Sequence, residues 1–203
     1  MYHLSCGEIW GGIRNCDEDL GSVDLTLSLY SFASDGSRGG DIYYLSLCDH
    51  NLLTRMIVAD VVGHGESVSE ISTYIYDAIK THINNVVCQD LLSELNCVAL
   101  EKGMDALTTM VVAAFYKSDG NLYFANAGHP AALFKRWDET NWLQLKLPKG
   151  VRNSALGISD EAVDSQSTIQ VKRGDCLLLY SDGLIEANNK DEELFGVKRL
   201  KNC

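Results

Sequence analysis

Two aspartates, Asp60 and Asp182, each follow an apolar run and precede a turn that contains glycine. Residues 56–60 read Met-Ile-Val-Ala-Asp, and residues 177–183 read Leu-Leu-Leu-Tyr-Ser-Asp-Gly. A buried strand that ends in this way delivers a carboxylate to the edge of a sheet, where a glycine turn lets backbone carbonyls and ligands approach. A carboxylate at the end of an apolar strand needs a partner. We therefore predict that these two acids bind a cation.

A third acid, Asp41, follows the glycine pair Gly39 and Gly40. Residues 42–48 and 54–59 are typical of two strands joined by a turn, so Asp41 opens one strand of a hairpin and Asp60 closes the other. In an antiparallel pair these positions are neighbours. Ligand sets made only of oxygen suit Mg²⁺ or Mn²⁺ rather than zinc or copper. Two such ions about 3.5–4 Å apart can activate a water molecule and hold a phosphoryl group.

An aspartate before glycine is in isolation most simply a turn, and we assign Asp119 to one. The histidines leave several interpretations open. His64 stands between Gly63 and Gly65. It could donate a proton to a phosphate, orient a carboxylate, or bond to the backbone at a helix start. His129 ends a strand before a proline, where a loop-fixing role and a catalytic role both remain open.

Two common catalytic motifs are absent from the sequence. No Gly-x-Ser-x-Gly surrounds Ser181, which argues against a serine hydrolase of the nucleophile-elbow type. No phosphate-binding P-loop motif occurs either, which argues against nucleotide hydrolysis of that kind.

The elements that would position these residues are strands and helices of ordinary length. Two amphipathic helices, one from Ser67 to about Val86 and one over about residues 90–102, present apolar stripes suited to covering a sheet. Residues 15–19 read as a turn-rich separator between two early strands. We expect a single α+β layered domain over residues 1–203, with a last helix from about Glu192. The remaining strands are predicted over residues 8–13, 23–33, 109–116, 121–126, 131–137, 142–147, 168–171 and 176–180.

Composition limits the class of protein. Of 203 residues, 46% are hydrophobic and 22% charged, as in a soluble globular domain. The net charge of -11 disfavours nucleic acid and anionic membranes as partners. The seven cysteines form no Cys-x-x-Cys pair, and no apolar run approaches the roughly 20 residues of a membrane span. The N-terminus does not read as a signal peptide. We expect a cytoplasmic protein with reduced thiols.

In their order and spacing, four segments resemble the metal-dependent serine/threonine protein phosphatases of type 2C (the PPM superfamily). The segments are residues 39–44, 59–65, 126–130 and 174–187. The resemblance is to the bacterial SpoIIE and RsbU branch and runs from about Gly39 to Leu200. It implies a four-layer αββα sandwich, with two central antiparallel sheets flanked by helices. It also implies two Mn²⁺ or Mg²⁺ ions and a metal-bound water as the nucleophile. The implied substrate is phosphoserine or phosphothreonine on a regulatory protein such as an anti-sigma-factor antagonist.

The resemblance also implies roles for individual residues. Asp60 would bridge the metals and hold the nucleophilic water, and the Val61 carbonyl would join one metal. Asp41 would bind a metal directly or through water, and Asp182 would bind the other metal. The residues expected to shape the site are Gly39, Gly40, Gly63, Gly65, Asn126, His129 and Gly183.

The sequence departs from the family pattern at its C-terminal end. Members continue past a Phe-Gly-x-x-Arg-Leu segment, here residues 195–200, through a helix to a strand that carries a last metal-binding aspartate. This sequence stops at Cys203, so we expect a domain truncated at that end and one ligand short. The acids at 191–193 read as a helix-start cluster. The alternative function is a catalytically weak or inactive phosphatase-like module that binds a partner. A two-metal phosphodiesterase would use the same chemistry, but the net charge argues against a nucleic-acid substrate.

Overall fold

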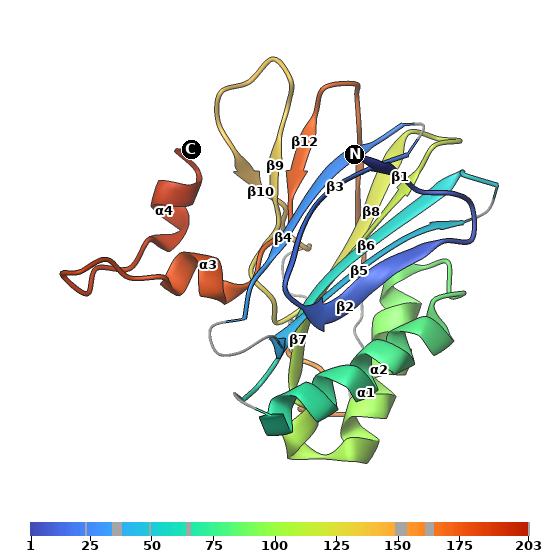
Figure 1. Cartoon of the computed structure of the whole chain (residues 1–203). Helices are drawn as coiled ribbons and strands as arrows, with labels where there is room; N and C mark the ends of the chain where they lie inside the picture. Colours follow the sequence, from blue (N-terminus) through green and yellow to red (C-terminus); the bar gives the residue numbers. More distant parts are fainter. Residues whose placement is uncertain are drawn as a thin grey trace.

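The computed structural model describes residues 1–22, 24–33, 38–48, 50–63, 66–148, 154–160 and 165–202. Its centre is a six-stranded sheet in which every neighbouring pair is antiparallel (Figure 1). The long strands β5, β6 and β7 form its middle, and most of their residues are buried because layers cover both faces. In spatial order the strands are β11 (Ser167–Gln170), β8 (Asn121–Ala127), β7 (Thr108–Tyr116), β6 (Leu53–Val61), β5 (Arg38–Cys48) and β2 (Ile9–Arg14).

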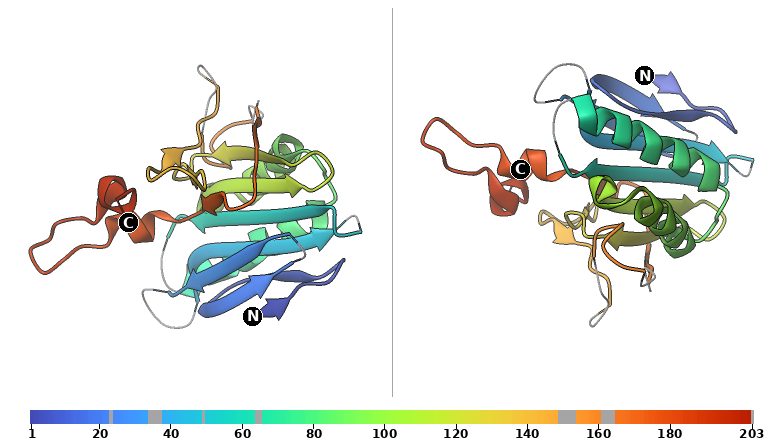
Figure 2. Two further views of the ribbon diagram at one scale, coloured as in Figure 1. Left: turned by 90° about the horizontal axis from the view of Figure 1, so that it is seen from above. Right: turned by 90° about the horizontal axis from the view of Figure 1, so that it is seen from below.

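Two helices, α1 (Glu66–His82) and α2 (Cys88–Lys102), cover one face of this sheet (Figure 2). Ile75 and Ile79 of α1 and Leu91 and Leu95 of α2 are fully buried in the core beneath them. Burying each such side chain contributes about 1.5–3 kcal/mol. The facing surface of the sheet carries small side chains that let the helices approach closely. These are Ala59, Ala114, Ala125 and Ala127.

A fully buried arginine fastens the connection between the two helices to the sheet. The guanidinium of Arg55, from β6, donates to the carbonyl of Ile83 and to that of Asn85 at 2.7 Å. These carbonyls follow the C-terminus of α1, where a cation is favoured by the helix dipole. Losing these bonds would leave a buried charge without partners, a change that ordinarily costs about 3–5 kcal/mol.

Two three-stranded sheets cover the opposite face of the central sheet. One has the order β1 (Tyr2–His3), β3 (Cys16–Gly21), β4 (Thr26–Ser31), and the other β10 (Leu143–Gln144), β9 (Leu133–Lys135), β12 (Cys176–Leu178). The first packs Leu20 against Leu45 of β5, and the second packs Leu177 against Ala113 and Phe124 of the central sheet. The second β layer is therefore made of two separate halves.

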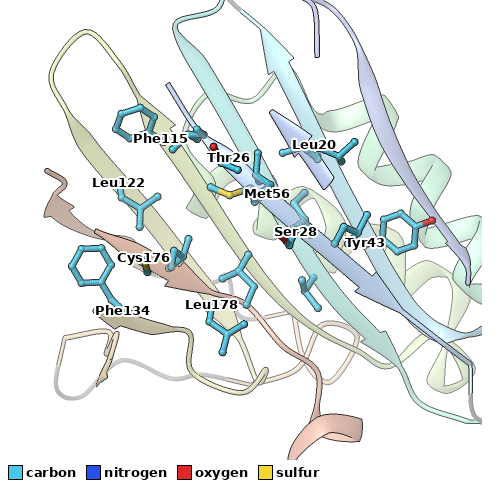
Figure 3. Close-up of a pocket in the computed structure, with 18 of the residues that line it drawn as sticks. Leu20, Thr26, Ser28, Tyr43, Met56, Phe115, Leu122, Phe134, Cys176 and Leu178 are labelled. Carbon is cyan, nitrogen blue, oxygen red and sulfur yellow. The ribbon is translucent and has the colours of Figure 1, made fainter. Parts of the chain in front are cut away.

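An apolar groove separates these two halves. It is bordered by β4 and β12, each an edge strand among the described residues, and its volume is about 310 Å³. Figure 3 shows Thr26 and Ser28 on one side, Cys176 and Leu178 on the other, and Met56 of the central sheet between them. Two strand edges thus border the same apolar surface.

The remaining short helices are η1 (Met104–Ala106), α3 (Asp182–Glu186) and α4 (Gly196–Leu200). Helices α3 and α4 lie beside the stacked sheets in Figure 1, and Leu200 joins a small core with Leu133 and Tyr180. Within the described residues, no helix is long and apolar enough to cross a membrane. The described cysteines are all free.

The expected α+β class, with antiparallel sheets flanked by helices, is confirmed. The prediction of a turn-rich separator at residues 15–19 is wrong, because Cys16–Gly21 forms β3. Asp17, Glu18 and Asp19 have low strand propensity, but pairing along all of β4 outweighs it, helped by a hydrogen bond from Ser28 to Asp19. The last helix begins at Gly196 rather than near Glu192, and α3 was not predicted.

Candidate metal centre

The predicted pairing of Asp41 with Asp60 is confirmed, since the two lie opposite each other in the β5 and β6 register. The next strand continues the row, because Thr109 of β7 lies opposite Asp60. Opposed residues of an antiparallel pair share a face, with Cβ atoms about 4.5–5.5 Å apart. On this face the preceding row is apolar, with Tyr43 and Val58 in register. The sheet therefore ends in a polar row, Asp41–Asp60–Thr109.

Gly40 makes room for two oxygens of the candidate site. A Cβ built on Gly40 would lie 2.7 Å from the Val61 carbonyl oxygen and 2.9 Å from Asp60 Oδ1. Both oxygens therefore converge on the space that a side chain would fill. Gly39 has no such restriction, since its Cβ would meet Ala33 at an ordinary 3.5 Å. Gly63 has a φ of 129°, a conformation that favours glycine after the strand end.

The segment after β12 brings Asp182, the remaining predicted acid, to the polar row. Ser181 donates a hydrogen bond from Oγ to Asp41 Oδ2 at 2.9 Å. Asp182 follows as the first residue of α3, with Gly183 behind it, and its side chain is exposed. Asp182 also acts electrostatically on both Asp41 and Asp60. Residues far apart in sequence thus meet at one end of the sheet.

The carboxylates of this site repel one another. Burial raises the pKa of Asp60 to about 7, and the charges of Asp41, Asp182 and Glu186 add to that rise. The pKa of Asp41 is also raised, chiefly by burial, with the Ser181 hydrogen bond opposing and the Asp182 charge adding to the effect. Such a cluster is stabilised either by protons or by cations, and hard divalent cations prefer carboxylate and carbonyl oxygens. The donors present fit Mg²⁺ or Mn²⁺.

The site is not a compact cage of side chains. Among the described residues, no three histidine, cysteine, aspartate or glutamate side chains come together as a metal cluster. Asp41, Asp60 and the Val61 carbonyl form its inner part, and Asp182 contributes from the exposed start of α3. His64 and Gly65 lie outside the described residues, so their predicted roles stay predictions.

His129 is buried at 4% exposure and makes the contacts of a loop-fixing residue. Its Nδ1 is hydrogen bonded to Thr109 Oγ1 at 2.8 Å. Asn126 closes the turn, accepting from the His129 N–H at 3.0 Å and donating to the His129 carbonyl at 2.9 Å. Burial lowers the pKa of the ring to about 4, so it is neutral at pH 7.

Three residues of this site were not predicted from the sequence. Thr109 could have been found by extending the hairpin register to the next strand. Glu186 lies four residues after Asp182, on the same side of a helix, but no helix was predicted there. Ser181 is next to a predicted ligand, yet nothing in the sequence indicates that its hydroxyl reaches Asp41.

Comparison with known proteins gives the same fold. A structure of the RsbU and RsbW domains from Mycobacterium tuberculosis matches with a TM-score of 0.70 and 20% identity, over 95% of this chain and 48% of that one. The SiaA PP2C domain of Pseudomonas aeruginosa matches at 0.66 and 21%, over 81% and 64% of the two chains. The PP2C phosphatase domain of SpoIIE from Bacillus subtilis, solved with a fragment of its regulatory domain, matches at 0.62 and 17%, over 89% and 48%.

The chain spans about half to two thirds of the length of these three structures. At such identities the likeness shows the phosphatase fold. The family model for stage II sporulation protein E matches residues 52–203, which is most of the chain. The chain therefore belongs to the SpoIIE family, and it has the fold of PP2C phosphatase domains.

Proposed function

We propose that this chain is a Mn²⁺- or Mg²⁺-dependent phosphatase that hydrolyses phosphoserine or phosphothreonine on a regulatory protein. The observation that carries the proposal is the convergence of Asp41, Asp60 and the Val61 carbonyl at one end of the sheet, with Gly40 keeping that space open. Only oxygen donors meet there, and they repel each other without cations.

The residues of the chain would bind and orient the ions. Asp60, in the middle of the row, would bridge two ions, Asp41 and the Val61 carbonyl would hold one, and Asp182 would hold the other. Bound there, the ions would neutralise the phosphoryl group and lower the pKa of an attacking water. Ser181 would keep Asp41 oriented through its hydrogen bond. The acidic surroundings make the cations necessary for a phosphate to enter.

We further propose that the substrate is a phosphorylated anti-sigma-factor antagonist or a similar regulator in the cytoplasm. The support is the kind of protein that matches this fold. One matching structure joins RsbU and RsbW domains, and another comes from work on the bacterial stressosome. The phosphorylated residue would have to reach the open end of the sheet, where Asp182 is exposed.

The test is phosphate release from a phosphoserine protein substrate with Mn²⁺, measured for the wild type, Asp60→Asn and Asp182→Asn. We expect the wild type to depend on Mn²⁺ and both variants to lose at least about 100-fold in rate, because each change removes a charged ligand. Asp119→Asn is the matched control, since Asp119 also precedes a glycine but sits in a turn, where it accepts from the N–H of Asn121. Equal rates in all four proteins would reject the proposal.

A non-catalytic binding module is the second candidate. It is favoured by the lack of a three-side-chain metal cluster among the described residues. Calorimetric titration with Mn²⁺ separates the two functions. If the chain is an enzyme, we expect it to bind Mn²⁺ and the Asp60→Asn variant to bind Mn²⁺ more weakly. If it is a binding module, we expect no heat of Mn²⁺ binding, although the phosphorylated partner still binds.

A further inference from the structure

Two arginines lie opposite each other at the end of the central sheet that carries the candidate metal centre. Arg14 ends β2 and Arg38 begins β5, and the register of these strands pairs them after an irregularity that follows Gly12. Both side chains are exposed. Opposed residues of an antiparallel pair have Cβ atoms about 4.5–5.5 Å apart, and like charges placed so repel each other. The pair therefore concentrates positive charge on a chain whose net charge is -11.

The arginine pair is close to the acids of the candidate metal centre along strand β5. Arg38 stands three residues before Asp41, a span of about 10 Å at the rise of a strand. The residues between them are Gly39 and Gly40, so no side chain of β5 separates the pair from the acids. An extended peptide covers the same distance in about three residues. A substrate bound at the acids can therefore reach the pair with a residue close to the one that reacts.

The side chain of Arg14 lies on the face of the sheet that carries the acids. A Cβ built on Gly12 would lie 3.5 Å from the Tyr43 hydroxyl oxygen and 3.8 Å from Arg14 Cγ, so both atoms border one small space. Tyr43 follows Asp41 by two residues in a regular stretch of β5, and alternate residues of a strand share a face. Arg14 also interacts with the Tyr43 hydroxyl, which leaves most of its five N–H donors unused.

The backbone beside each arginine is held in place by Ala33. Asn15, which follows Arg14, accepts a hydrogen bond on Oδ1 from the Ala33 N–H at 2.8 Å. A Cβ built on Gly39, which follows Arg38, would meet the Ala33 Cβ at 3.5 Å. Among the described residues, neither arginine forms an ion pair with an acid. The two guanidinium groups can therefore take an anion from another molecule.

We propose that Arg14 and Arg38 together bind an acidic side chain of the substrate, about three residues from its phosphoserine. A guanidinium presents parallel N–H donors that match the two oxygens of a carboxylate, and a carboxylate bound by both arginines would relieve their repulsion. The spacing from the phosphoserine rests on the proposed function, whereas the binding of a carboxylate by the pair does not. The pair would make the enzyme select phosphoproteins that carry an acidic residue near the modified serine.

The first measurement is Mn²⁺-dependent phosphate release from two synthetic phosphoserine peptides. One peptide carries glutamate three residues before and three residues after the phosphoserine, and the other carries glutamine at both positions. We expect the wild type to have a KM about five- to tenfold lower for the glutamate peptide, the effect of two charge-assisted contacts at an exposed site. Low ionic strength keeps this electrostatic difference large.

Variants of the two arginines and a matched control show where that preference arises. Arg14→Gln and Arg38→Gln keep a polar side chain but remove its charge, so each should lower the ratio of the two KM values. The double variant should bring the ratio to about one. Arg173→Gln removes an exposed arginine before β12, at the end of that strand away from Asp182, and should keep the wild-type ratio.

Three results of these kinetics would overturn the proposal. The first is an equal KM for both peptides in the wild type. The second is a ratio that falls as far in Arg173→Gln as in Arg14→Gln, because net charge would then explain the preference. The third is a KM that rises equally for both peptides in Arg14→Gln, which would favour a contact with the phosphoryl group itself.

Direct binding separates this proposal from the proposed function. If the wild type releases no phosphate from either peptide, the proposed function fails, and fluorescence anisotropy with labelled forms of the same peptides decides the role of the arginines. Tighter binding of the glutamate peptide that the double variant loses would support the role, and equal binding of both peptides would overturn it. If the wild type releases phosphate with equal KM values, only the role of the arginines fails.

Discussion

The surroundings of Asp60 disfavour the ionised form of its carboxyl group when no cation is bound. Its folded-state pKa of about 7 lies above the ordinary value of 3.8, because burial and three neighbouring acids oppose its charge. An unfolded chain releases this proton near pH 4, whereas the folded chain keeps it until about pH 7. The unfolded state therefore binds fewer protons in that window, so folding stability falls as the pH rises from 4 to 7.

Replacing Asp60 with Asn should therefore stabilise the metal-free protein at pH 8. Asn keeps the shape but removes the charge, and because the site is partly open to solvent we expect a gain on the order of 1 kcal/mol, or about 2–4 °C in melting temperature. At pH 4 the difference should shrink, since Asp60 is then protonated in the folded state and close to half protonated in the unfolded state, whose ordinary pKa is 3.8. Calorimetric melting at both pH values checks this, with Asp138→Asn, at an exposed turn position, as the control. A lower melting temperature for Asp60→Asn at pH 8 would contradict the electrostatic explanation.

At the scale of elements, strand β5 reaches the site with two adjacent glycines that have different surroundings. A Cβ on Gly40 would lie 2.7 Å from the Val61 carbonyl oxygen and 2.9 Å from Asp60 Oδ1, whereas a Cβ on Gly39 would meet Ala33 at ordinary contact distance. A methyl group on Gly40 must therefore push back the two oxygens that we assign to the metal centre.

Gly40→Ala should therefore weaken Mn²⁺ binding at least about tenfold and lower stability by about 1–3 kcal/mol through overpacking. Gly39→Ala is the matched control, with the same change one residue earlier in the same strand. It should bind Mn²⁺ like the wild type and be neutral or slightly stabilised. Calorimetric titration and melting of both variants give the comparison. Wild-type Mn²⁺ affinity in Gly40→Ala would show that the space at Gly40 is not part of the site.

Local patterns predicted the hairpin of β5 and β6, because two apolar runs around a short turn fix a register that places Asp41 opposite Asp60. The same reasoning missed β3, since its acids resemble a turn and only the pairing with β4 makes them a strand. Ser181 and His129 show the larger limit. Their contacts to Asp41 and Thr109 join distant elements, and no local pattern specifies which side chains meet when those elements pack.

At the scale of the whole molecule, the divided second layer leaves two strand edges beside an apolar surface. Strands β4 and β12 border the groove, and within the described residues neither pairs with a strand on that side. An edge strand offers unpaired N–H and carbonyl groups to any other strand, and apolar side chains beneath it favour such pairing. Lysine on an edge opposes that association, because its charge would have to be buried.

We therefore expect the purified chain to self-associate through this groove, so that its apparent mass in analytical ultracentrifugation rises with concentration. Ser28→Lys on β4 and Cys176→Lys on β12 each place a charge on one bordering edge and should lower that rise, with the double variant lowest. Thr81→Lys, on an exposed position of α1, adds the same charge far from the groove and serves as the control. A reducing agent excludes disulfide-linked dimers through the exposed Cys6, Cys97 and Cys176. If Thr81→Lys lowers the association as much as Ser28→Lys, net charge rather than the strand edges controls it.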